Sequence, residues 1–122
     1  MMQKLRILIC DDDDGILDML SMVLNNKGYD VVTEIHSTNI YDTLNEVKPD
    51  LLLLDLWMPK LNGEEILKTL KQKADTKMLP VVVMSASRDG AEIAKRSGAD
   101  DYLEKPFDIM KLVTKIQANV HN

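Results

Sequence analysis

The chain has 122 residues, 45% of them hydrophobic, and its 20 acidic and 15 basic residues give a net charge of −5. This length suits one domain with a single core, and the acidic balance argues against a nucleic-acid binder held by phosphate contacts. A single cysteine, Cys10, excludes a disulfide framework or a zinc site of clustered thiols, and no signal peptide or membrane span is visible. We therefore expect a monomeric, cytoplasmic protein in which residues 1–122 form one domain without an output domain.

The first half of the chain alternates strand patterns with helix patterns. Residues 5–10 form an apolar strand that ends at four aspartates, and apolar residues at helical spacing follow over 16–27. Residues 29–35 are half polar, which predicts a strand at a sheet edge. A second helix is expected over 41–47, because Pro49 cannot continue it.

The second half begins with four leucines at 51–54, which predict a short strand buried on both faces because a half-exposed strand would alternate. Further elements are expected as a helix over 64–73, a strand over 80–84, a short helix over 89–96, a strand over 101–103 and an amphipathic helix over 109–120. The helix over 89–96 has little to bury and should be the least firmly held. Five strands alternating with five helices predict a parallel α/β sheet covered on both faces.

Polar side chains follow four of the five predicted strands. They are Asp11 and Asp12 after the first strand, Asp55 after the third, Ser85 after the fourth and Lys105 after the fifth. Parallel strands bring these residues to one edge of the sheet, and the absence of a comparable residue after the second strand fits the doubly wound order 2-1-3-4-5.

The chemistry of this edge suggests phosphoryl transfer. Three crowded carboxylates repel each other unless a cation shares them, and an all-oxygen ligand set suits Mg²⁺. An aspartate can act as a nucleophile to form an acyl phosphate. Phosphoryl transfer then demands positioning and charge neutralisation, which Mg²⁺, the Lys105 ammonium and the Ser85 hydroxyl would supply.

Four motifs in this order resemble those of a response-regulator receiver domain of two-component signalling. They are ILICDDD at 7–13, LDLWMP at 54–59 followed by Gly63, VMSA at 83–86 and GADDYLEKPF at 98–107. The resemblance covers essentially the whole chain and implies a flavodoxin-like (βα)5 fold. It also implies a signalling module that is not an enzyme in the usual sense, with a sensor histidine kinase as phosphoryl donor. From the acidic charge balance and the lack of a visible membrane span, we expect no nucleic-acid or membrane partner.

The resemblance assigns a role to each site residue. It makes Asp55 the phosphoacceptor, Asp11, Asp12, Asp55 and the backbone carbonyl of Trp57 the Mg²⁺ ligands, Ser85 the switch hydroxyl, Tyr102 the switch aromatic and Lys105 the contact to the phosphoryl group. The downstream partner would be a protein effector. The alternatives are a phosphorelay role, in which Asp55 passes the group to a histidine phosphotransfer protein, and an interaction module that works without phosphorylation.

Simpler interpretations stand beside these roles. Asp13 and Asp14 fit a helix cap better than a site, and Tyr102 could equally be a packing residue. An aspartate-nucleophile phosphatase would also use Asp55, but it needs a second Asp two residues later as the acid/base. Trp57 occupies that position, which argues against a phosphatase. We expect Met19 and Met22 to fill core gaps, Cys10 to be buried and inert, and His36 and His121 to lie at the surface. The isomer of the Lys105–Pro106 bond is left open.

Overall fold

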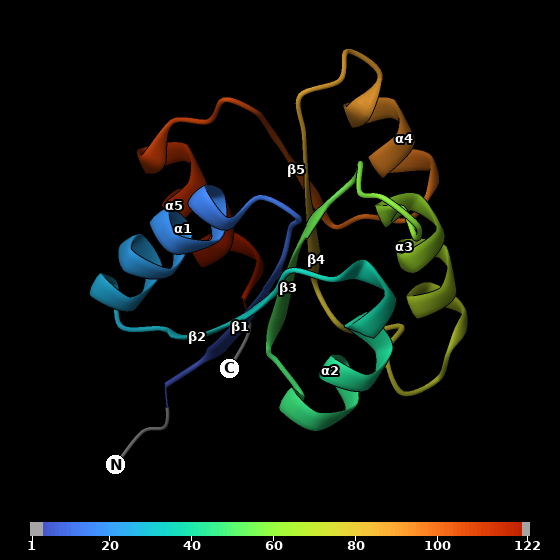
Figure 1. The fold of residues 1–122 in the computed structure, drawn as a ribbon, viewed down its shortest axis with the longest axis horizontal. Helices are drawn as coiled ribbons and strands as arrows, with labels where there is room; N and C mark the ends of the chain where they lie inside the picture. Colours follow the sequence, from blue (N-terminus) through green and yellow to red (C-terminus); the bar gives the residue numbers. More distant parts are fainter. Residues whose placement is uncertain (1–3, 121–122) are drawn as a thin grey trace.

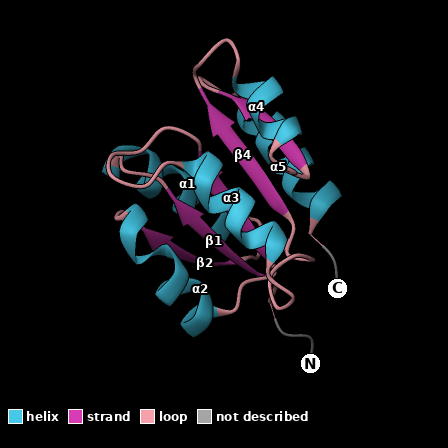
Figure 2. Ribbon diagram, turned by 90° about the vertical axis from the view of Figure 1, so that its right-hand side faces the viewer, coloured by secondary structure: helices cyan, strands magenta, loops and turns pink. Residues whose placement is uncertain are grey.

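The computed structural model describes residues 4–120, which form a five-stranded sheet in the order β2-β1-β3-β4-β5. The strands are β1 Arg6–Cys10, β2 Asp30–Glu34, β3 Leu51–Asp55, β4 Val81–Ser85 and β5 Asp101–Glu104. All four neighbouring pairs are parallel, and the arrows of β1, β2 and β4 can be followed in Figure 2. The predicted strand order and the edge position of the second strand are therefore confirmed.

Helices cover both faces of the sheet. They are α1 Asp14–Asn26, α2 Ile40–Val47, α3 Gly63–Gln72, α4 Gly90–Arg96 and α5 Ile109–Asn119, with a short 3₁₀ turn, η1, at Ser37–Asn39 before α2. Helices α1 and α5 lie on one side of the sheet and α2, α3 and α4 on the other (Figure 1). The sequence pattern did not predict η1.

Within residues 4–120, no helix combines the length and the apolar character needed to cross a bilayer.

The sheet separates two hydrophobic cores, and the leucine run contributes to both. Leu52 and Leu54 pack with α2, α3 and α4, whereas Leu51 and Leu53 pack with α1 and α5. All residues of β3 and β4 are buried. Successive side chains of a strand point to opposite faces, so an unbroken apolar run is what a doubly covered strand requires.

The outward face of α1 corrects one expectation. Met19 and Met22 are 36% and 67% exposed, so they do not fill core gaps. The inward stripe is already complete with Leu17, Leu20 and Leu24, which are buried at helical spacing. Met19 and Met22 lie off this stripe, so their side chains are exposed to solvent.

The two histidines were both expected at the surface. His36, just before η1, is exposed, so this prediction is confirmed. His121 lies outside the described residues.

Gly63 is required for lack of space and not for an unusual backbone conformation. Its φ angle is not positive, but a Cβ at this position would collide with the carbonyl oxygen of Asp55 and lie 2.8 Å from Cα of Leu56. The Gly63 amide also donates a 2.8 Å hydrogen bond to the carbonyl of Leu56. The first turn of α3 thus packs directly on the backbone that carries Asp55.

Gly63→Ala is expected to lower the free energy of unfolding by about 1–3 kcal/mol, the usual cost of overpacking a tight site. Urea unfolding would measure the loss. Gly15→Ala is the matched control, because Gly15 also lies in a first helical turn and its nearest neighbour, Asp13 Oδ1, would be 3.2 Å from the new Cβ. Equal stability of the two variants would contradict the steric argument.

Candidate functional site

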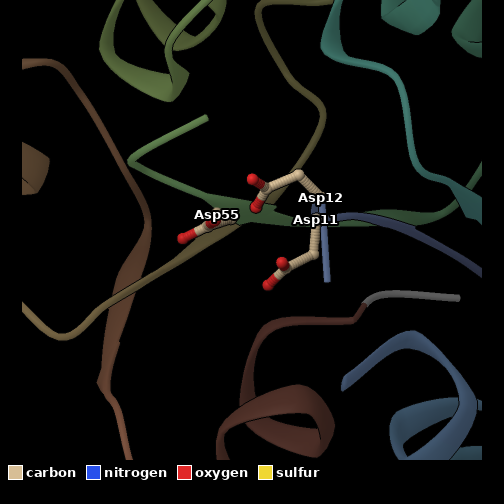
Figure 3. A group of neighbouring side chains, drawn as sticks. All are labelled: Asp11, Asp12 and Asp55. Atoms are coloured by element: carbon tan, nitrogen blue, oxygen red, sulfur yellow. The ribbon is translucent and has the colours of Figure 1, made fainter. Parts of the chain in front are cut away.

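Three carboxyl groups meet at the carboxyl edge of the sheet (Figure 3). Asp11 and Asp12 directly follow β1, and Asp55 is the last residue of β3. One oxygen of each lies within 4.8 Å of the others; Asp11 and Asp55 are buried and Asp12 is exposed. An all-oxygen set that is open to solvent on one side fits a hard divalent cation.

Lys105 lies against two of these acids. Its Nζ is 2.7 Å from Asp11 Oδ2 and 3.4 Å from Asp55 Oδ1, and its side chain is 16% exposed. Its backbone N–H donates to the carbonyl of Ser85, and the Lys105–Pro106 bond is cis. Burial alone would lower the pKa of Lys105, but the hydrogen bond to Asp11 and the charge of Asp55 raise it overall. The ammonium is therefore charged at neutral pH.

The surroundings of Asp55 disfavour the charged form of its carboxyl group. Burial, followed by the charge of Asp11, raises the pKa of Asp55 from 3.8 to about 6, against the opposing influence of Lys105; the charge of Asp12 raises it further. One lysine does not balance three acids. A second cation at this edge would favour the ionised, nucleophilic form of Asp55.

Cys10 lies beneath the acid cluster. Burial, followed by the charge of Glu34, raises the pKa of the Cys10 thiol to about 12, and Cys10 Sγ contacts Met58 Sδ at 3.8 Å. The thiol is therefore protonated at neutral pH, as the prediction of an unreactive cysteine requires.

Ser85 and Tyr102 form a second pair beside the acids. Ser85, the last residue of β4, is buried, and its Oγ accepts a 3.0 Å hydrogen bond from the Ser87 N–H. The hydroxyl of Tyr102 on β5 donates to the carbonyl of Ser85 at 3.1 Å. Within residues 4–120, no hydrogen bond joins Ser85 Oγ to the three acids.

Trp57 lies in the loop between β3 and α3 and is 49% exposed. Trp57 is thus two residues beyond Asp55 in the chain. The proposed role of its backbone carbonyl as a Mg²⁺ ligand stays a prediction.

The neighbouring acids serve the fold. The carboxylate of Asp13 caps α1 by accepting from the N–H groups of Gly15 and Ile16, so the prediction of a cap is confirmed. Glu34, at the end of β2, accepts from Thr43 Oγ1 at 2.6 Å and from the His36 N–H. Its carboxylate is thus directed to α2, which explains why no second-strand residue enters the acid cluster.

A separate cavity of about 500 Å³ lies between α2 and α3. Its lining includes Tyr41, Leu44, Leu70 and Lys73, and none of the residues of the acid cluster.

Two glycines for which the sequence pattern predicted no contact are close neighbours of the site. Gly63 packs on the backbone of Asp55, and Gly90, the first residue of α4, packs on Ser85 and Tyr102. Both glycines stand at a helix start, and Gly63 also belongs to a family motif, but neither signal distinguishes a close approach from a simple turn.

The fold and this edge define a flavodoxin-like α/β domain with an acidic, lysine-paired site at the carboxyl ends of its strands. The family model described as "Response regulator receiver domain" matches residues 7–117. The chain therefore belongs to the response regulator receiver domain family.

Relatives and solved structures agree with this assignment. The chain is 37% identical over 117 residues to the DNA-binding response regulator MtrA of Mycobacterium tuberculosis, covering 94% of this chain and 50% of MtrA. It is 36% identical over 115 residues to the phosphate regulon transcriptional regulatory protein PhoB of Klebsiella pneumoniae, covering 93% of this chain and 50% of PhoB. The chain thus spans about half the length of the curated relatives it matches.

Two solved structures resemble the whole fold. A response regulator from Chloroflexus aurantiacus has a TM-score of 0.90 and 30% identity, covering 95% of this chain and 97% of its own. The chemotaxis protein CheY4 of Vibrio cholerae has a TM-score of 0.88 and 25% identity, covering 97% of this chain and all of its own.

Proposed function

We propose that this receiver domain accepts a phosphoryl group on Asp55 from a phosphohistidine of a sensor kinase. The observation that carries the proposal is the buried Asp55 carboxylate at the strand end, within reach of two further acids and 3.4 Å from Lys105 Nζ. An oxygen of Asp55 attacks phosphorus, and the bond from phosphorus to the imidazole nitrogen breaks. The electron pair of that bond returns to the histidine, which takes up a proton.

The residues around Asp55 divide the work of this transfer. Mg²⁺, held by Asp11, Asp12 and Asp55 together with the Trp57 carbonyl, would supply positive charge next to the phosphoryl oxygens. The Lys105 ammonium already lies beside Asp55 and contributes a second charge. Ser85 Oγ accepts from Ser87, which leaves its own proton free to donate to a phosphoryl oxygen.

The response to phosphorylation is proposed as a population shift. Ser85 moves toward the phosphoryl group, Tyr102 follows because its hydroxyl holds the Ser85 carbonyl, and α4 with β5 presents a new face. The small size of α4, in which only Gly90, Ile93 and Ala94 are buried, supports this choice of mobile element. Amide exchange over 89–104 should differ with and without phosphorylation, and equal protection would contradict the shift.

Partners follow from this mechanism as proposals. The kinase is the phosphoryl donor, and a protein effector reads the changed face; a histidine phosphotransfer protein is the alternative acceptor. MtrA and PhoB are named as DNA-binding or transcriptional regulators, and they are about twice as long as the matched region. The stand-alone arrangement therefore stays a prediction.

The decisive experiment is the intact mass after incubation with Mg²⁺ and acetyl phosphate, then with a phosphorylated histidine kinase. We expect one phosphoryl group on the wild-type protein, and none on Asp55→Asn or without Mg²⁺. Reversible transfer back to a histidine protein would favour the relay, and a partner that binds only the phosphorylated form would favour the effector role. Failure of both donors to label Asp55 would overturn the proposal in favour of a phosphorylation-independent interaction module.

A further inference from the structure

We propose that Gly90 is a positioning residue of the switch: its missing side chain lets the first turn of α4 close onto Ser85 and Tyr102 and keeps the Tyr102 hydroxyl on the Ser85 carbonyl. This inference rests on the proposed function and deepens it, because it names the contact through which α4 senses Ser85.

The space around Gly90 is filled by the two switch side chains. A Cβ at Gly90 would lie 2.7 Å from the hydroxyl oxygen of Tyr102, 2.8 Å from Cβ of Ser85 and 2.9 Å from Oγ of Ser85. Each distance is shorter than non-bonded carbon contacts tolerate. The φ angle of Gly90 is not positive, so space, and not backbone conformation, is what requires glycine at this position.

The other glycines show that this contact is specific. Gly15 occupies a first helical turn as well, but its only close neighbour is Asp13 Oδ1 at 3.2 Å. Gly63 is tighter, but its neighbours are the backbone of Asp55 and Leu56. Gly90 is the one glycine of residues 4–120 whose close neighbours are the side chains of Ser85 and Tyr102.

The turn before α4 leaves little freedom to avoid the contact. The Ser87 N–H donates to Ser85 Oγ, the Gly90 N–H donates to the Ser87 carbonyl at 3.2 Å, and the Ser87 hydroxyl bonds to the carboxylate of Asp89. Behind Gly90, Ile93 is buried in the core on that side of the sheet. Moving α4 away would disturb these contacts together.

Of the two side chains next to Gly90, the half-buried Tyr102 is the one that can move away from a new Cβ. Its ring lies on the edge strand β5, and its hydroxyl makes one hydrogen bond, to the Ser85 carbonyl. A methyl group at Gly90 would lie only 2.7 Å from the oxygen of that hydroxyl, so the ring would turn toward solvent. Conversely, a movement of Ser85 toward a phosphoryl group on Asp55 would open space under Gly90 that α4 can enter.

The first test needs no phosphorylation. The chain has three tyrosines, so 3-fluorotyrosine labelling gives three ¹⁹F resonances, and Tyr102→Phe identifies that of Tyr102. In Gly90→Ala we expect the Tyr102 resonance alone to shift and to gain a larger H₂O/D₂O solvent shift, while Gly15→Ala leaves all three unchanged. An unchanged Tyr102 resonance in Gly90→Ala would overturn the proposal.

A double-mutant cycle separates the switch contact from a general packing defect. Gly90→Ala should lower Tm less in the Tyr102→Phe background, which lacks the nearest atom, than in the wild-type background. If Gly90→Ala does not fold, recovery of a folded protein in the double variant supports the proposal. An equal loss in both backgrounds, or no recovery, refutes it.

The last arm connects Gly90 with signalling. Gly90→Ala keeps the phosphoacceptor Asp55 and should still gain one phosphoryl group from acetyl phosphate and Mg²⁺, since the three atoms closest to a Cβ at Gly90 belong to Ser85 and Tyr102. On phosphorylation, its amide exchange over 89–104 should change less than that of the wild type. An undiminished change would count against the coupling. If the wild type itself is not labelled, the proposed function fails, and the fluorine spectra still decide the place of Tyr102.

Discussion

Asp55→Asn is expected to stabilise the metal-free protein near neutral pH, although it removes the phosphoacceptor. The pKa of Asp55 is raised from 3.8 to about 6 in the folded protein, first by burial and then by Asp11. The unfolded chain therefore releases this proton at lower pH than the folded chain does. The stability that the protonated carboxyl group contributes is fully present below about pH 4 and is lost as the pH rises through about 6.

The size of this effect follows from the shift. A shift of about two pH units corresponds to roughly 3 kcal/mol between the two protonation states, and asparagine keeps the shape of the side chain without its charge. We therefore expect Asp55→Asn to unfold at a higher urea concentration than the wild type at about pH 7.5 in EDTA, with a gain on the order of 2 kcal/mol. At about pH 4 the gain should nearly vanish.

The control is Asp75→Asn, which removes an exposed aspartate outside the cluster. It should change stability equally little at both pH values. A cation bound at the acidic edge would stabilise the folded wild type by mass action, so adding Mg²⁺ should narrow the gap between wild type and Asp55→Asn. A pH-independent gap would show that the carboxyl group of Asp55 is not the source.

The sequence predicts the sheet and the gathering of the acids because both follow from local pattern. The leucine run can be satisfied only by burial on both faces, and parallel strands carry Asp11, Asp12, Asp55 and Lys105 to one edge whatever the details of packing. This is why the strand order was predictable and why the three carboxyl groups were expected to lie together.

The remaining features depend on distances between segments, which a pattern does not contain. The prediction that Met19 and Met22 fill gaps in the core is wrong, because leucines already fill the inward face of α1. Gly63 and Gly90 were not recognised as contact residues, because each helix start packs on strand residues whose distance from it is set only by the folded chain. Tyr102, for example, reaches Gly90 from the neighbouring strand β5.

The detailed pairing within the site is a further feature of this kind. Lys105 lies 2.7 Å from Asp11 and 3.4 Å from Asp55. These distances depend on how the long Lys105 side chain lies in the folded site, which the positions of the residues in the sequence do not fix.

Lys105→Met is expected to destabilise the metal-free protein strongly. The substitution keeps the length of the side chain but removes the ammonium from between Asp11 and Asp55, at 2.7 and 3.4 Å. Removing one partner of a buried pair leaves an uncompensated buried charge, which typically costs about 3–5 kcal/mol. Urea unfolding in EDTA at neutral pH would measure this loss.

Lys115→Met gives the matched control, because Lys115 pairs with Asp101 at 2.9 Å but both side chains are about one-third exposed. Exposed pairs contribute about 0–1 kcal/mol, so this variant should remain close to the wild type.

The loss of stability in Lys105→Met should depend on the other charges at this edge. Without the ammonium, Asp55 and Asp11 repel each other at close range, so Lys105→Met should cost less in the Asp55→Asn background, and the two effects should not add. Mg²⁺ should restore more stability to Lys105→Met than to the wild type, because the ion would then be the main positive charge at this edge. Additive effects, or a Mg²⁺ response equal to that of Lys115→Met, would mean that Lys105 acts mainly through the packing of its aliphatic stem, and that the charge balance inferred for this site is wrong.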